Sequence, residues 1–138
     1  MKKTILLLAC LLALLSYHNV VNGQDMSKKN YAYFSLEPKI TTNYLKPNAK
    51  KLGYVRVSIE LMLEDAEFLV AAEHHSPLMR AAIIEVFGSQ KEEKVRSLVG
   101  RDDIRRICLE KLKELMIKET GSEIVKEVIF TEYLFFAS

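Results

Sequence analysis

The chain has 138 residues, of which 49% are hydrophobic, with only 5 glycines and 3 prolines. This composition is that of one ordinary globular domain and excludes a disordered, collagen-like or low-complexity chain. Basic side chains number 20 and acidic ones 18, and the two counts become equal once Lys2 and Lys3 are set aside. The bulk charge therefore indicates no nucleic-acid partner.

The N-terminus has the features of an export signal. Lys2 and Lys3 provide a basic start, and residues 5–15 form an apolar block. As a helix this block would reach roughly 17 Å, against the ~30 Å of hydrocarbon that a membrane span has to cross. A block this short after a dibasic start is typical of a bacterial secretory signal and makes a poor transmembrane helix.

The residues after the block supply a cleavage site. Val21-Asn22-Gly23 places small or β-branched residues where a signal peptidase reads the chain. We therefore expect a cleavable signal peptide over residues 1–23, cut between Gly23 and Gln24, and export of the mature protein to the periplasm. The alternative is that this segment stays uncleaved and anchors the protein in the inner membrane.

One domain over residues 31–138 is expected to follow a short, polar and flexible lead-in over residues 24–30. Residues 31–45 mix aromatics, Ile and Thr around Pro38, which suits an extended strand that is bent or lies at a sheet edge. Over residues 52–63 apolar and polar side chains alternate, which is the period of a half-buried strand. This second strand is the clearest in the chain.

Helical periodicity follows the second strand. Residues 64–75 have apolar side chains at helical spacing, and Ser76-Pro77 has the pattern of an N-cap followed by proline at the first helical position. We therefore expect a new, deeply buried helix to begin there and to end at Gly88. A short charged turn or helix is expected over residues 91–96.

The longest helical pattern begins after Gly100 and is expected to end at Gly121. Its apolar stripe carries Cys108, which we therefore expect in the core as a small hydrophobic side chain. Asp102 and Asp103 are expected in the first turn, where acidic side chains interact favourably with the helix dipole.

The chain returns to β character over residues 124–136, which are rich in Val, Ile, Phe and Tyr. The order of elements is then strand, strand, helices, strand. This order predicts an α+β fold in which strands at both ends of the mature chain pair around a helical middle segment.

Patterns for catalysis and metal binding are weak. His74 and His75 are adjacent, so on a helix they point about 100° apart and do not suit one metal ion. We interpret them as the end of a helix, where imidazole is favourable. Cys108 has no histidine near it in sequence, and the glycines occur singly, unlike a phosphate-binding loop. We therefore expect no catalytic residues, no metal and no cofactor.

The candidate interaction site is a mixed-charge run near the start of the longest helix. Charges of both signs are typical of a solvated face, and they also suit a contact with a complementary neighbour. We select as a possible assembly interface Arg101, Asp102, Asp103, Arg105 and Arg106.

Five segments of the chain, taken in order, resemble one known family. They are Tyr33-Phe34-Ser35-Leu36-Glu37-Pro38-Lys39-Ile40-Thr41-Thr42-Asn43, Tyr54-Val55-Arg56-Val57-Ser58-Ile59-Glu60-Leu61, Ser76-Pro77-Leu78-Met79-Arg80-Ala81-Ala82-Ile83-Ile84, Leu98-Val99-Gly100-Arg101-Asp102-Asp103-Ile104-Arg105 and Val128-Ile129-Phe130-Thr131-Glu132-Tyr133-Leu134-Phe135. Their order and spacing from Tyr33 to Phe136 are similar to the periplasmic domain of the flagellar basal-body-associated protein FliL family.

The resemblance implies a stomatin-like (SPFH-like) α+β domain that assembles into rings beside the stator units of the flagellar motor. Such a protein supports flagellar rotation and motility and is not an enzyme. Its implied partners are copies of itself and flagellar stator and basal-body proteins, on the periplasmic side of the inner membrane. The family usually keeps a full transmembrane helix, whereas a cleavage site follows the short apolar block here. The alternative is a periplasmic small-molecule-binding protein or enzyme unrelated to motility.

Overall fold

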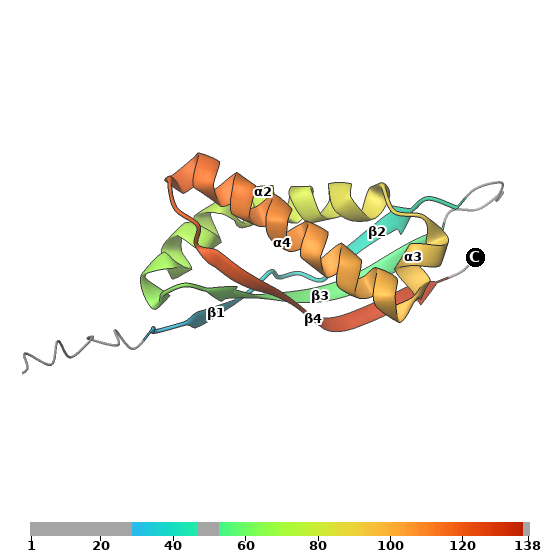
Figure 1. Ribbon diagram of the computed structural model, residues 1–138, viewed down its shortest axis with the longest axis horizontal. Helices are drawn as coiled ribbons and strands as arrows, with labels where there is room; N and C mark the ends of the chain where they lie inside the picture. The colour runs from blue at the N-terminus through green and yellow to red at the C-terminus, as the bar shows by residue number, and fades with distance from the viewer. Residues whose placement is uncertain (1–28, 47–52, 137–138) are drawn as a thin grey trace, which may run out of the picture.

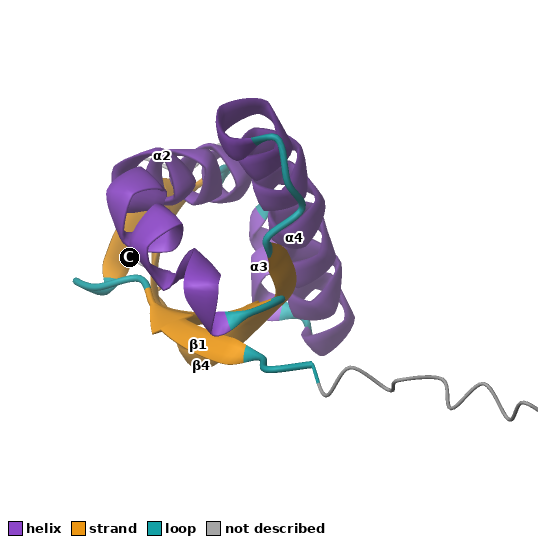
Figure 2. Cartoon of the chain, turned by 90° about the vertical axis from the view of Figure 1, so that its left-hand side faces the viewer, coloured by secondary structure: helices purple, strands orange, loops and turns teal. Residues whose placement is uncertain are grey.

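The computed structural model describes residues 29–46 and 53–136. The predicted signal peptide, its cleavage site and most of the lead-in lie outside the described residues. In chain order the elements are β1 (Ala32–Ser35), β2 (Ile40–Tyr44), β3 (Gly53–Leu63), the short 3-10 helix η1 (Ala66–Phe68), α2 (Leu69–Gly88), α3 (Glu92–Arg96), α4 (Leu98–Thr120) and β4 (Val125–Phe136). The helices form one layer and the sheet another (Figures 1 and 2). The predicted α+β class is confirmed.

The central strand of the sheet is β3. On one side β4 pairs antiparallel with it along almost its whole length, from Phe136 opposite Tyr54 to Val125 opposite Leu63. On the other side β1 and β2 each pair antiparallel with a different part of β3. The prediction that the last strand pairs with an earlier one across the helical segment is confirmed.

The segment over residues 31–45 is two strands and not the single bent strand that the sequence predicts. Between β1 and β2 the Glu37-Pro38 peptide bond is cis, and Pro38 has no N–H to donate to a strand ladder. The Leu36 N–H still donates to the Ile59 carbonyl at 2.9 Å, and Arg80 of α2 donates to the Leu36 carbonyl at 2.9 Å. The chain therefore stays against β3 while its pairing register changes.

The prediction that a helix restarts at Ser76-Pro77 is wrong, because α2 is continuous and Pro77 lies inside it. Proline removes the hydrogen bond to the carbonyl four residues earlier. Pro77 and Glu73 are both exposed, so that carbonyl is left on the water-facing side of the helix. His74 and His75 consequently lie inside α2. The prediction that they end a helix is wrong.

The burial of α2 is one-sided, whereas the sequence predicts a deeply buried helix. Leu78 and Ile84 are 46% and 41% exposed. The inward face of the helix carries Ala72, Met79, Ala82, Ile83, Val86 and Phe87. A single layer of helices on the sheet leaves the opposite face of each helix without a neighbouring layer, so apolar residues there stay in contact with water. The predicted end of this helix at Gly88 is confirmed.

The longest helix, α4, begins at Leu98 and not after Gly100. The Ser97 hydroxyl caps it by accepting the Gly100 N–H at 2.9 Å. A Cβ atom on Gly100 would lie 2.1 Å from the Lys94 carbonyl oxygen. Glycine is therefore required there for the close approach of α4 to α3, and it does not mark a helix start. At the other end, Gly121 adopts a φ of 79° and closes the helix as predicted.

The hydrophobic core lies between the helices and the inner face of the sheet. The alternating side chains of β3 contribute Val55, Val57, Ile59, Leu61 and Leu63, and the inner stripe of α4 contributes Ile104, Cys108, Leu112 and Met116. The predicted half-buried strand is confirmed, and so is the placement of Cys108 on the buried stripe of the longest helix.

Candidate partner-binding surface

The charged residues of the predicted interface lie near the beginning of α4. Because the helix begins at Leu98, Asp102 and Asp103 lie beyond its first turn, so the expectation that they interact with the helix dipole is wrong. They instead bind arginines one turn further along. Asp102 pairs with Arg105 at 3.0 Å and with Arg106 at 3.3 Å, and Asp103 also pairs with Arg106. These are the three- and four-residue spacings at which helix side chains meet.

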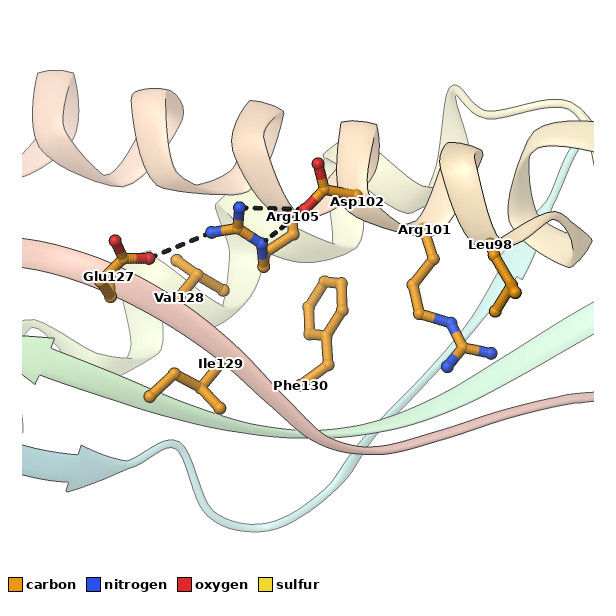
Figure 3. A pocket seen from close by; sticks show the side chains of 8 residues that line it. All are labelled: Leu98, Arg101, Asp102, Arg105, Glu127, Val128, Ile129 and Phe130. Carbon is orange, nitrogen blue, oxygen red and sulfur yellow. Dashed lines mark hydrogen bonds and ion pairs between the residues drawn. The ribbon is translucent and has the colours of Figure 1, made fainter.

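The five charged residues do not share one surface. Arg106 is exposed on the outer side of α4, and both of its ion pairs are to acids of its own helix. Arg105 turns toward the sheet, where its guanidinium bonds Glu127 of β4 at 3.1 Å as well as Asp102 (Figure 3). Arg105 thus connects α4 to the last strand, whereas within the described ranges the ion pairs of Arg106 stay on α4.

Arg101 has no acidic partner among the residues that the structure describes. Its guanidinium lies over the ring of Tyr133, 4.4 Å from the ring centroid. Its Nε atom is buried and meets no hydrogen-bond acceptor in the described part of the chain. The Tyr133 hydroxyl donates to the Val95 carbonyl at 2.9 Å, which holds the ring in place. Burial raises the pKa of Tyr133 to about 12, although the charge of Arg101 opposes this shift, so the hydroxyl stays a neutral donor at physiological pH.

A groove of about 410 Å³ lies between the start of α4 and β4 (Figure 3). It is lined by Leu98, Arg101, Asp102 and Arg105 of α4 and by Glu127, Val128, Ile129 and Phe130 of β4. Three of the five predicted interface residues therefore border one groove, and Asp103 and Arg106 lie outside it. Sequence reasoning missed the β4 half of the groove, because no pattern in residues 124–136 indicates which helix lies beside them.

His74, His75 and Cys108 are not among the residues that line the groove. The rings of His74 and His75 meet edge-to-face with centroids 4.8 Å apart. Within residues 29–46 and 53–136, no group of three or more His, Cys, Asp or Glu side chains is arranged to hold a metal ion. Cys108 is fully buried, and burial raises the pKa of its thiol to about 12, which keeps it protonated and unreactive. Of the helices in the described ranges, none combines the length and hydropathy that a membrane crossing requires.

Comparison with known proteins supplies the family. Residues 33–135 match the family model described as flagellar basal body-associated protein FliL. The chain belongs to the FliL family. A curated relative, the flagellar protein FliL of Aquifex aeolicus (strain VF5), is 29% identical over 101 residues, which cover 73% of this chain. The matched region spans only 59% of the length of that relative.

The FliL match begins within β1 and ends within β4. It therefore includes both walls of the groove, and the resemblance inferred from the five sequence segments is confirmed. The flagellar basal-body association that the sequence predicts follows from this membership at the level of the family.

Proposed function

We propose that this protein is a non-enzymatic flagellar basal-body component that supports flagellar rotation by binding stator or basal-body proteins. The observation that carries the proposal is the FliL match, which covers nearly all of the described fold. The curated relative from Aquifex aeolicus is itself named a flagellar protein. This match favours a motility role over the alternative of a periplasmic small-molecule-binding protein or enzyme.

Three further features of the protein are inferred from the family resemblance. The domain is stomatin-like, it assembles with copies of itself into rings, and it acts on the periplasmic side of the inner membrane. A surface suited to protein contacts supports the assembly role, because Leu98 and Val99 at the start of α4 are 78% and 75% exposed. Adjacent exposed apolar side chains beside arginines are typical of sites that bind other proteins.

Complementation of a deletion strain tests the proposal. We expect the deletion to reduce the diameter of swimming zones in soft agar, and a tagged wild-type copy to restore it and to form foci at flagellar bases. The double variant Leu98→Asp with Val99→Asp should restore swimming poorly, because both side chains are exposed and their replacement removes a contact without disturbing the core.

Val70→Asp on α2 is the matched control, because Val70 is equally exposed at 76% and lies on a different helix. It should complement like the wild type. Normal swimming of the deletion strain, together with a tagged copy spread evenly around the cell, would contradict the proposed function.

A further inference from the structure

We propose that the groove between α4 and β4 binds an extended segment of another protein, which adds as a strand to the outer edge of β4 and places an acidic side chain on Arg101. The inference deepens the proposed function by specifying how a partner is held. It rests on that function only for the partner's identity. Three features of the groove carry it: a strand edge, a guanidinium without a counter-charge, and an apolar rim.

The first feature is the edge of β4. In the described part of the chain β4 pairs with β3 alone, so the N–H and C=O groups on its other side have no strand partner. Successive side chains of a strand point to opposite faces. Four consecutive residues, Glu127 to Phe130, line the groove, so the groove follows the main chain of β4 and is not confined to one face of the strand. Such an edge accepts a further strand through main-chain hydrogen bonds.

The second feature is the charge of Arg101. A guanidinium with a buried, unpartnered Nε carries an uncompensated desolvation cost. The aromatic ring of Tyr133 holds the group in one position, so an incoming carboxylate would meet a preorganised donor. Arg105 differs, because Asp102 and Glu127 already neutralise it. The groove therefore favours an acidic side chain at its Arg101 end. At its Glu127 end the charge of Arg105 is already paired, so a second acidic side chain is not favoured there.

The third feature is apolar surface beside Arg101. Leu98 stands at the rim of the groove and is almost fully exposed, and the half-buried Phe130 lies on the β4 side (Figure 3). A strand added to β4 would place alternate side chains toward α4. The preferred segment thus carries apolar residues at alternate positions and an Asp or Glu among them.

The size of the groove favours a bare segment over a folded second copy of this chain. Its volume of about 410 Å³ suits a few residues in extended form. Self-association through this groove is therefore treated as a competing outcome in the test.

The test starts from peptides displayed on phage, using random twelve-residue sequences selected on the purified full chain. Selected peptides are synthesised with a fluorescein label, and their Kd values are measured by fluorescence anisotropy. We expect enriched peptides to alternate apolar residues and to contain one acid. Replacing that acid by its amide should weaken binding about tenfold or more, as expected for loss of a charge-assisted hydrogen bond.

Matched arginine variants locate the site. Arg101→Gln should raise the Kd of the same peptide about tenfold or more. Arg106→Gln should leave this Kd unchanged, because Arg106 lies on the same helix but outside the groove. Thermal unfolding establishes that both variants are folded. Leu98→Asp provides a second variant that does not depend on the packing of Arg101 on Tyr133, and it should also weaken binding.

The backbone of the peptide distinguishes strand addition from other modes of binding. N-methylation at alternate residues should abolish binding in one phase of alternation and spare it in the other, because only one set of N–H groups faces β4. Equal effects of both phases, an unchanged Kd with Arg101→Gln and Leu98→Asp, or a selection without acidic alternating peptides would each overturn the proposal. The proposal would also be overturned if the protein formed a concentration-dependent dimer that Arg101→Gln abolishes and that the peptide does not dissociate, because the groove would then bind a second copy of the chain. None of these measurements involves motility, so failure of the flagellar role would be seen separately.

Discussion

The two faces of α4 carry similar residue types in opposite environments. On the inner side Arg101 lies over Tyr133 and Arg105 bonds Glu127, so both arginines contact or approach the last strand. On the outer side Arg106 is 62% exposed, and its ion partners among the residues that the structure describes are acids of its own helix. Charge alone therefore does not distinguish a groove residue from a solvated one. What distinguishes them is whether the side chain contacts a residue of β4 across the groove.

The largest effect is expected at Gly100, which allows α4 to approach α3. In Gly100→Ala the new Cβ would lie 2.1 Å from a backbone oxygen, so the start of α4 has to move. We expect a loss of about 2–4 kcal/mol in the free energy of unfolding, measured by urea denaturation. Gly88→Ala is the control, because a Cβ built there meets none of the described residues within 4 Å beyond its chain neighbours and the backbone of its own helix. A wild-type midpoint for Gly100→Ala would show that this close approach does not position the helix.

A smaller loss is expected at Cys108 on the buried face. Cys108→Ser places a hydroxyl among apolar side chains and should cost about 1–3 kcal/mol in the free energy of unfolding. Ile107→Ser, at the preceding position, where the side chain is exposed, should cost much less. The native protein should also react slowly with a thiol reagent, and rapid labelling of Cys108 would contradict its burial.

Alkaline pH should reduce stability through the same thiol. Burial raises the pKa of Cys108 to about 12, whereas the thiol of an unfolded chain titrates near ~8.5. As pH rises between these values, the unfolded state loses the proton first, so the unfolding free energy falls. Urea titrations at neutral and alkaline pH should therefore show a shallower fall for Cys108→Ala than for the wild type. Parallel pH profiles would indicate that the thiol does not contribute.

The smallest effects on stability are expected for charge reversals. Arg105→Glu removes the ion pairs to Asp102 and Glu127 and adds a third acid beside these two, and the cost should stay near the ~0.2–1 kcal/mol of each partly exposed ion pair. Arg106→Glu should change stability less still, because its pairs are more exposed.

The two reversals should differ in partner binding. Arg105→Glu should weaken binding at the groove and Arg106→Glu should not, as measured by fluorescence anisotropy with the selected peptide after circular dichroism has established that both are helical. Equal losses would indicate that the outer face of α4 also takes part. Combining Arg105→Glu with Arg106→Glu should impair swimming in soft agar. The control combination, His74→Ala with His75→Ala, should leave swimming nearly normal.

Local patterns in the sequence determined much of the fold. The alternation over residues 52–63 predicted β3, and helical spacing placed Cys108 in the core, because strand and helix periods follow from backbone geometry alone. The order of these elements predicted the α+β class, and five short segments were sufficient to indicate the FliL family. Of the predicted interface, Arg101, Asp102 and Arg105 do border the groove, although whether a partner binds there stays a prediction.

Only the tertiary structure decided where the helices begin and what the charged residues face. Pro77 is tolerated inside α2 because the Glu73 carbonyl, which loses its hydrogen bond, faces water. The helix α4 begins at Leu98 because Ser97 caps it and Gly100 packs on α3. The groove depends on contacts such as Arg105 with Glu127 and Arg101 with Tyr133. These partners lie far apart in the chain, so the local periodicity of the sequence does not predict their contacts. Only the packing of α4 beside β4 brings them together.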